Sequence, residues 1–249
     1  PLSYDSLESF PKEKREKIRE ELLHLDETKK AEAKNYKEYV RELVGPTLME
    51  MFFIKYPQKL WGVAVDQMTA NWAPKRVNFH RTKGHFHMGQ WSAVGKDGAG
   101  SVMERMAEKF VKNGGELHFN STLTAIETNG TTVTGLVFGE QKVVVAPEDV
   151  LVSTMPLPRL AELLGVPNEL KYRGAKLIFV ALNKAQAIAG LPSFLYYDDP
   201  EIIFHRVSEQ KKFSALGFQE DKTLLSLDVS YTLDEERDRL SDRHLIERG

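Results

Sequence analysis

The fold is decided by one stretch in the first third of the chain, Phe53-Ile-Lys-Tyr-Pro-Gln-Lys-Leu-Trp-Gly-Val-Ala-Val-Asp-Gln-Met-Thr-Ala-Asn-Trp72. Its first half is a short amphipathic run that reaches Gly62, and glycine commonly follows the last turn of a helix. Tyr56, Lys59 and Trp61 lie just ahead of that glycine. The stretch therefore predicts a helix whose last turns carry aromatic and cationic side chains.

The overall composition is that of a globular protein. The chain has 249 residues, of which 41% are hydrophobic and 28% charged, with a formal net charge of -2. This length allows one large domain or two small ones. A dedicated nucleic-acid binder would be clearly basic, so that class is excluded. No apolar run has the length of a membrane span, and the absence of cysteine excludes disulfides and is consistent with a reducing, cytoplasmic setting.

Two helical patterns precede the decisive stretch. Residues 11–34 are densely charged with a thin apolar stripe, which favours a solvated surface helix over a partner-binding one. From Tyr36 to Phe52, apolar residues recur at three- and four-residue steps, which predicts a buried helical face. Gly45-Pro46 interrupts this pattern, so we expect two helices joined at a kink.

A segment without acidic residues follows, between Asp66 and Asp97. It carries five cations, Lys75, Arg76, Arg81, Lys83 and Lys96. In a loop, such a segment offers charge-assisted donors to an anionic ligand, and an ordinary surface loop is the equal alternative. Its histidines His80, His85 and His87 have no carboxylate nearby, so no metal is expected.

An α/β order begins near Gly98. Residues 102–111 carry a helical apolar face, and Ser101 with Glu104 forms a capping-box sequence ahead of it. Asn129-Gly130 separates two β-rich runs and predicts a tight hairpin with positive φ at both residues. Residues 116–119 and 150–153 are expected to be short strands. Helix, strand and meander in this order exclude a helical bundle.

After Pro158 the pattern changes again. A short helix precedes three β-rich blocks at residues 175–183, 201–208 and 223–231. Turn-rich stretches separate the blocks, which predicts an antiparallel sheet. The expected fold class is therefore α+β (α/β).

Common catalytic motifs are absent from the sequence. It contains no nucleophile elbow, no Walker loop and no zinc-protease motif, so the catalytic residues are unknown. A Gly-x-Gly-x-x-Gly fingerprint, which would place a dinucleotide diphosphate on a helix, is also missing.

The order of these pieces, from about Tyr36 to Tyr231, resembles a superfamily of FAD-dependent enzymes. Its members include the amine oxidases, protoporphyrinogen oxidase-like proteins and UDP-galactopyranose mutases. The Lys59-Leu-Trp-Gly62 helix end resembles part of their substrate domain, and the stretch from Gly98 to Gly115 resembles the helix that re-enters their FAD domain. The resemblance implies an internal piece of such an enzyme, without the N-terminal dinucleotide-binding unit and the C-terminal FAD segment.

The resemblance also implies site residues. The cofactor would be FAD, contacted by Leu123 through its backbone and by Ser153, Thr154 and Pro156 at a proline turn, with ordinary strand packing as the alternative. Arg206-Val-Ser-Glu-Gln-Lys-Lys-Phe213 is similar to a strand that UDP-galactopyranose mutases place in the substrate site. Substrate would then be bound by Arg206, Trp61 and Arg76, with a salt bridge from Arg206 to Glu209 or Asp228 as the alternative.

Three segments are expected on this basis. Residues 1–97 would be the helical part of a substrate domain, residues 98–158 an FAD-domain segment with a β-meander, and residues 159–249 the antiparallel sheet of the substrate domain. The flavin would carry the chemistry, and the piece alone would bind FAD weakly or not at all.

Three functions remain open from the sequence. The first is an FAD-dependent oxidoreductase of the protoporphyrinogen oxidase or amine oxidase type. The second is a flavin-dependent sugar-nucleotide mutase, and the third is a non-catalytic interaction module that uses the charged helix. The expected partner is a small molecule, with an anionic ligand among the options, and the oligomeric state is unknown.

Overall fold

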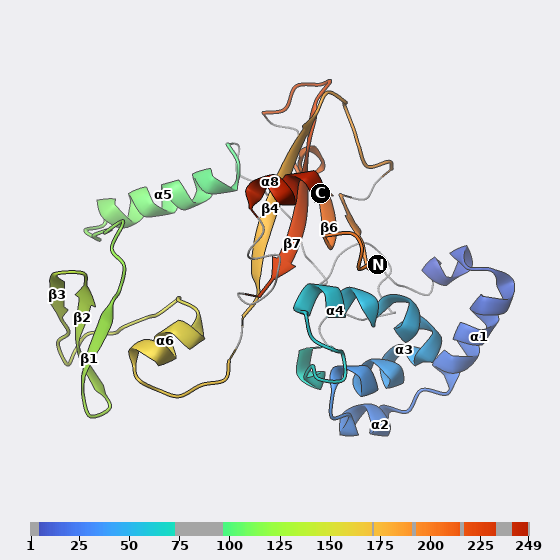
Figure 1. The fold of residues 1–249 in the computed structure, drawn as a ribbon, viewed down its shortest axis with the longest axis horizontal. Coiled ribbons are helices and arrows are strands. Elements are labelled where there is room, and N and C mark those ends of the chain that lie inside the picture. Colours follow the sequence, from blue (N-terminus) through green and yellow to red (C-terminus); the bar gives the residue numbers. More distant parts are fainter. Residues whose placement is uncertain are drawn as a thin grey trace. The chain divides into compact units, whose positions relative to one another are not determined.

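The structure is a computed structural model that describes residues 5–72, 97–170, 172–190, 193–214, 217–232 and 241–248. The chain divides into two compact units, unit 1 with residues 1–94 and 173–249 and unit 2 with residues 95–172. Helices and antiparallel sheets occur in both (Figure 1), so the expected α+β class is confirmed. The division into three segments stays a prediction.

The first part of unit 1 is helical. It contains η1 (Asp5–Ser9), α1 (Lys12–Leu23), α2 (Glu27–Glu32), α3 (Tyr36–Phe52), α4 (Lys55–Trp61) and η2 (Ala70–Trp72). Its core forms around the apolar face of α3, where Tyr36, Val40, Val44 and Leu48 are buried. The periodicity of the sequence predicted this buried face correctly.

Helix α3 is kinked at Gly45, as the Gly-Pro pair predicts. Gly45 has φ 80° and ψ 161°, a conformation outside the helical region. The carboxylate of Glu21 on α1 accepts hydrogen bonds from the backbone N–H of Thr47 at 2.9 Å and from its hydroxyl at 2.7 Å. Glu21 therefore caps the second half of α3 from a neighbouring helix, because the kink leaves N–H groups there without helical acceptors.

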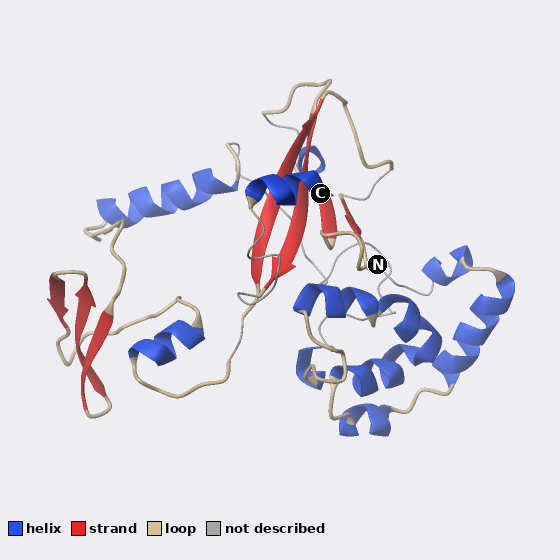
Figure 2. Cartoon of the chain, in the orientation of Figure 1, coloured by secondary structure: helices blue, strands red, loops and turns tan. Residues whose placement is uncertain are grey.

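The second part of unit 1 is a four-stranded antiparallel sheet in the order β4-β7-β6-β5 (Figure 2). Its elements are β4 (Gly174–Leu182), β5 (Phe194–Tyr196), β6 (Arg206–Glu209), η3 (Gln210–Lys212), β7 (Thr223–Tyr231) and α8 (Asp242–Arg248). One face carries a core in which Ile178, Val207, Leu227 and Val229 are buried together with Leu245 of α8. The antiparallel sheet was predicted, whereas β5 was not.

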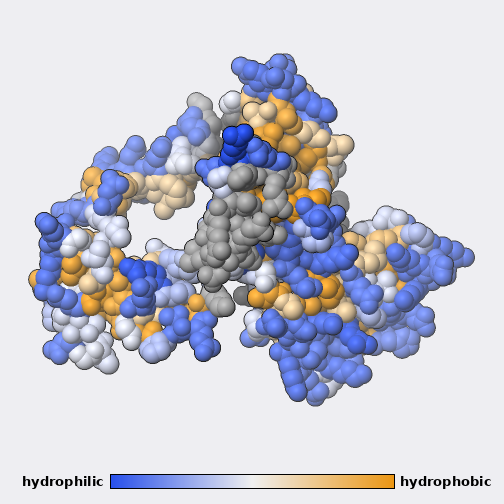
Figure 3. Space-filling view, viewed as in Figure 1, coloured by the Kyte–Doolittle hydropathy of each residue, from blue (hydrophilic) through white to orange (hydrophobic). Residues whose placement is uncertain are grey.

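Unit 2 contains α5 (Ala99–Lys112), α6 (Leu157–Leu163) and a three-stranded antiparallel meander. The strands are β1 (Ala125–Asn129), β2 (Thr132–Phe138) and β3 (Gln141–Val144). Figure 3 shows apolar surface over the meander and α6. Strands this short expose much of their side-chain area.

The β1–β2 hairpin exists, but its turn is shifted by one residue from the expected one. Asn129 pairs with Thr132, so the two loop residues are Gly130 and Thr131. Gly130 has φ 65°, and Asn129 is not among the residues with positive φ. Between Glu127 and Thr128 the register shifts, because β2 advances by two residues, from Gly135 to Val133, and Thr134 is left as the extra residue of a β-bulge.

Three local predictions in unit 2 were wrong. Helix α5 begins at Ala99, and Ser101 donates to the carbonyl of Gly98 at 2.8 Å instead of capping the helix. Residues 116–119 and 150–153 are not strands. A strand requires a ladder partner, and neither segment pairs with any residue that the structure describes.

Candidate functional site

The sheet of unit 1 presents a second face, opposite the core with α8, and we call it the Arg206 face. Side chains alternate between the two faces of a strand, so the register assigns its members. They are Ala175, Leu177, Phe179 and Ala181 of β4, Leu224, Ser226, Asp228 and Ser230 of β7, Arg206 and Ser208 of β6, and Phe194 and Tyr196 of β5. The face thus has a polar middle with apolar and aromatic side chains on both flanks.

The middle and the flanks of the Arg206 face differ in burial. Ser226, Asp228 and Ser230 are buried, whereas Leu177 is 51% and Phe179 59% exposed. Exposed apolar side chains at this density on one strand face are typical of binding surfaces. The arrangement therefore offers apolar contact at the flanks and, in the centre, mainly the side chain of Arg206, which is 42% exposed.

Arg206 forms an ion pair with Asp228, directly opposite on β7. Its Nε donates to Oδ2 of Asp228 at 2.8 Å, and its Nη2 donates to the same oxygen. Burial lowers the pKa of Arg206, but the hydrogen bonds and the charge of Asp228 outweigh burial, and the pKa lies above its ordinary value. Arg206 is therefore permanently charged, and its charge is balanced inside the protein.

Helix α4 contributes an aromatic ring at the β5 side of the site. The ring of Tyr56 lies edge-on to Tyr196 with centroids 4.9 Å apart, and 6.0 Å from the ring of His205. Nε2 of His205 lies 2.8 Å from the hydroxyl of Ser230. A second contact comes from Lys59, whose Nζ donates to the carbonyl of Asp199 at 2.7 Å. The helix that the decisive stretch predicts is thus fixed against the sheet.

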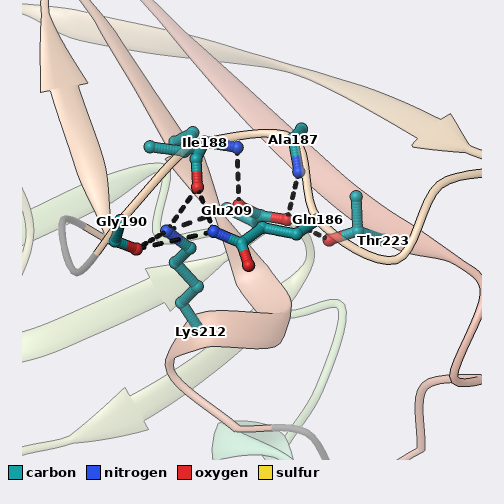
Figure 4. Close-up of polar contacts among 7 residues, drawn as sticks. All are labelled: Gln186, Ala187, Ile188, Gly190, Glu209, Lys212 and Thr223. Atoms are coloured by element: carbon teal, nitrogen blue, oxygen red, sulfur yellow. Dashed lines mark hydrogen bonds and ion pairs between the residues drawn. The ribbon is translucent and has the colours of Figure 1, made fainter.

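A buried carboxylate fixes the end of β6 (Figure 4). Glu209 is 1% exposed and accepts from the backbone N–H groups of Ala187 at 2.8 Å and Ile188 at 2.9 Å, and from the hydroxyl of Thr223 at 2.7 Å. Burial raises the pKa of Glu209, but these three hydrogen bonds and the charge of Lys212 outweigh burial and lower the pKa. Glu209 therefore acts as an internal anchor of the sheet.

Lys212 completes the anchor from η3. Its Nζ donates to the carbonyls of Ile188 at 2.6 Å and Gly190 at 2.7 Å, and lies 3.8 Å from the carboxylate of Glu209. Phe213 follows directly and stacks on Phe194 of β5, with centroids 6.5 Å apart. The anchor therefore holds the loop at residues 186–190 and also the aromatic flank of the Arg206 face.

The three expected substrate residues have different positions. Arg206 lies on the sheet face described above. Trp61 packs against the helical core and lies edge-on to Trp72, with centroids 5.5 Å apart. Arg76 and the other cations of the acid-free segment, including Lys96, lie outside the described residues. Their convergence on one ligand stays a prediction.

The alternation expected around Arg206 was wrong. Phe204 and Arg206 should share a face if residues 202–207 were one strand. Strand β6 begins only at Arg206, and Phe204 packs against the core cluster, with its ring edge-on to Tyr197 at 5.1 Å. The two side chains therefore belong to different sides of the sheet.

The four expected flavin contacts all lie in unit 2. Leu123 is half-buried just ahead of β1, and neither its N–H nor its carbonyl joins a backbone hydrogen bond among the described residues. Ser153, Thr154 and Pro156 are exposed, and Pro156 precedes the first residue of α6. Accessible backbone at both places fits a group that is bound through main-chain contacts. That Leu123 and residues 153–156 meet at one cofactor stays a prediction.

Sequence reasoning missed most of the Arg206 face. It treated Asp228 only as one possible salt-bridge partner, and it did not consider Leu177, Phe179 or Tyr196. A signal was present in β7, where Ser226, Asp228 and Ser230 recur at every second residue. This period is typical of a strand with one polar face.

The described ranges contain neither a candidate metal site nor a candidate membrane-spanning helix. No group of three His, Cys, Asp or Glu side chains there is arranged to hold a metal ion. No helix within the same ranges is both long enough and apolar enough to cross a membrane.

Comparison with known proteins identifies the class. Residues 6–211 match the model of the family described as flavin containing amine oxidoreductase. The match covers most of the chain, so the chain belongs to the flavin-containing amine oxidoreductase family. No curated protein matches the sequence.

Several solved structures share the fold, and two of them serve as examples. One is the crystal structure of reduced UDP-galactopyranose mutase, with a TM-score of 0.69 and 17% identity, in which the match covers 97% of this chain and 56% of that one. The other is a putative protoporphyrinogen oxidase from Exiguobacterium sp. 255-15, with a TM-score of 0.68, 17% identity and coverage of 96% and 55%. The chain therefore spans little more than half the length of each.

Proposed function

We propose that this chain supplies the substrate-binding surface and part of the flavin-binding surface of an FAD-dependent oxidoreductase of the protoporphyrinogen oxidase or amine oxidase type. Membership of a flavin-containing family supports the cofactor. The main support for an oxidoreductase is the composition of the Arg206 face. Its only two charges within the four strands neutralise each other, and its flanks are apolar.

In this proposal unit 2 contacts the cofactor and unit 1 contacts the substrate. When bound, FAD would accept a hydride from the substrate. In unit 2, the backbone of Leu123 and the residues 153–156 would contact the cofactor. In unit 1, Leu177, Phe179 and Tyr196 would hold the apolar body of the substrate by removing it from water. No residue of the chain is assigned as a proton acceptor.

Exclusion of water is the main contribution expected from the Arg206 face. Each fully buried apolar side chain gains about 1.5–3 kcal/mol over its exposed state. Leu177 and Phe179 are more than half exposed, so a ligand that covers both would recover a large part of that energy. This binding energy orients the substrate without a charged contact.

A flavin-dependent sugar-nucleotide mutase is the second candidate. Its support is the side chain of Arg206, which is 42% exposed in spite of its ion pair, and the fold shared with UDP-galactopyranose mutase. A substrate phosphate could contact the exposed part of the guanidinium. The mutase needs no electron acceptor, because its reaction has no net redox change.

One experiment separates the two candidates. The intact protein is purified with its flavin and mixed without oxygen with candidate amines or with a UDP-sugar. The oxidoreductase predicts bleaching of the oxidised flavin by an apolar substrate and turnover that requires an electron acceptor. Isomerisation of the UDP-sugar without an acceptor would contradict the oxidoreductase and support the mutase.

A further inference from the structure

The charge balance of the Arg206 face depends on a single carboxylate. Within strands β4 to β7, the register places only two charged side chains on this face, Arg206 and Asp228. The side chain of Asp228 is 8% exposed, and that of Arg206 is 42% exposed. A ligand on this face would therefore meet the guanidinium and hardly any of the carboxylate that neutralises it.

The carboxylate of Asp228 accepts hydrogen bonds from two donors of the Arg206 guanidinium. Nε and Nη2 of Arg206, the two donors that form one edge of the guanidinium, both point to Oδ2 of Asp228. Two donors on one edge are the group that arginine uses for bidentate recognition of carboxylates and phosphates. Asp228 thus has the place that an anionic ligand would take.

The surroundings strengthen this effect. Asp228 lies between Ser226 and Ser230 along β7, and all three residues are buried. The hydroxyl of Ser226 is 3.5 Å from Oδ1 of Asp228. In such a part-buried setting a charge pair is screened less by water than at an open surface. An incoming anion would have to compete with a fixed internal partner.

We propose that Asp228 is a specificity-determining residue that masks Arg206, so that the Arg206 face selects apolar ligands without net negative charge over anionic ones. This inference rests on the proposed function and narrows it to the amine oxidase type, because a porphyrinogen carries carboxylates that the masked face would reject. It assigns rejection of anions to one side chain. Removing the negative charge of Asp228 should convert the same face to an anion-selective surface.

A pair of probes with the same ring and different charge tests this proposal. Naphthalene-2-methanol is neutral and naphthalene-2-sulfonate is anionic, and both can lie on one apolar flank beside Arg206. Their dissociation constants are measured by equilibrium dialysis with the flavin-free 249-residue chain. The ratio of the two constants reports charge selection, and a general loss of packing would weaken both probes together.

The expected results have opposite signs for the two partners. The wild type should prefer the neutral probe. Asp228→Asn should shift the ratio about tenfold towards the sulfonate, because the charged donors of Arg206 then have no anionic partner in the protein and can bind the sulfonate. Arg206→Gln should shift it in the other direction, because the carboxylate then lacks its partner. The double variant should return close to the wild-type ratio.

Asp221→Asn is the matched control. Asp221 is exposed just ahead of β7, so this variant makes the same change in net charge and should leave the ratio unchanged. A wild type that prefers the sulfonate, that binds neither probe, or that Asp228→Asn leaves unaltered would overturn the proposal. Failure to fold of Asp228→Asn, checked by circular dichroism, leaves Arg206→Gln as the deciding variant. The assay contains no flavin, so its failure is distinct from absence of FAD in the intact protein.

Discussion

Glu209→Gln tests the anchor that holds the site side of the sheet. Glutamine keeps the size of the side chain but replaces one carboxylate oxygen by an NH2 group. In the native structure both oxygens accept hydrogen bonds, Oε1 from Ala187 and Thr223 and Oε2 from Ile188. Either orientation of the glutamine amide therefore directs its NH2 group at another donor.

The expected loss of unfolding free energy in Glu209→Gln follows from the number of donors that lose an acceptor. At least one buried donor is left without a partner, at about 1–3 kcal/mol, and the remaining bonds lose their charge assistance. Lys212 also keeps its charge 3.8 Å from a group that is now neutral. We expect unit 1 to lose about 2–4 kcal/mol of unfolding free energy at neutral pH. The matched control Glu220→Gln changes an exposed carboxylate and should lose less than about 0.5 kcal/mol.

The pH dependence gives a second readout with a defined sign. The pKa of Glu209 lies below its ordinary value of 4.5 in the folded protein. Its contribution to stability is therefore complete above that ordinary value and is lost as pH falls through the lower folded pKa. The stability gap between wild type and Glu209→Gln should be constant from neutral pH to about 5 and should shrink in stronger acid.

Urea unfolding followed by circular dichroism measures the stability difference between the wild type and Glu209→Gln. Hydrogen exchange at the amides of Ala187 and Ile188 shows whether the loss of stability is local to the anchor. The variant should speed exchange at these two amides more than in the core of α3, where Val44 and Leu48 are buried. If Glu209→Gln is as stable as Glu220→Gln, or if its stability difference from the wild type widens in acid, Glu209 does not anchor the sheet.

Three further predictions concern other parts of the chain. Gly45→Ala should destabilise unit 1 by about 2–3 kcal/mol, because Gly45 has φ 80° and an added Cβ would lie 2.9 Å from Cβ of Glu21. Gly100→Ala, where an added Cβ meets nothing within 4 Å, is the control in thermal unfolding, and equal losses would contradict the account of the kink. Gly130→Val should weaken the meander by about 1–2 kcal/mol because of its φ of 65°, whereas Asn129→Ala should cost less. Hydrogen exchange in β2 measures both, and a larger effect of the Asn129 substitution would indicate that the turn is at Asn129-Gly130, as the sequence predicts. The purified 249-residue chain should be nearly colourless, and stoichiometric flavin in its absorption spectrum would show that this chain holds FAD by itself.

The elements governed by local signals could be predicted from the sequence. The buried face of α3 follows from apolar periodicity, and its kink follows from the Gly45-Pro46 pair. Strands β4 and β7 were also found within one residue of their ends, because each is a long β-rich run between turns. In these places the local preference and the tertiary structure agree.

Predictions that depended on tertiary partners were less successful. The turn of the first hairpin moved by one residue because the bulge at Thr134 changed the register. Residues 116–119 and 150–153 have the composition of strands, but a ladder needs a second strand, and composition does not reveal whether one is present. The predicted strand at residues 201–208 was wrong for the same reason, since only Arg206–Glu209 pairs with β7.

The candidate site was predicted only in part. The similarity around Arg206 directed attention to the correct strand, and Asp228 was considered as a partner. The sequence could not show that the two residues are directly opposite, because the register of β6 on β7 is set by packing and by the anchor at Glu209. The role of Leu177 and Phe179 required knowledge of which face of β4 is covered.

We propose that the intact protein is a flavin oxidoreductase whose substrate rests on the Arg206 face. The most direct measurement is the visible absorption spectrum of the purified intact protein, before and after mixing with an apolar amine without oxygen. We expect an oxidised flavin band that the substrate bleaches, with slower bleaching in a Phe179→Ala variant that keeps the same flavin content. Intact, folded protein without flavin, or flavin that only a sugar nucleotide engages without net reduction, would contradict the proposal.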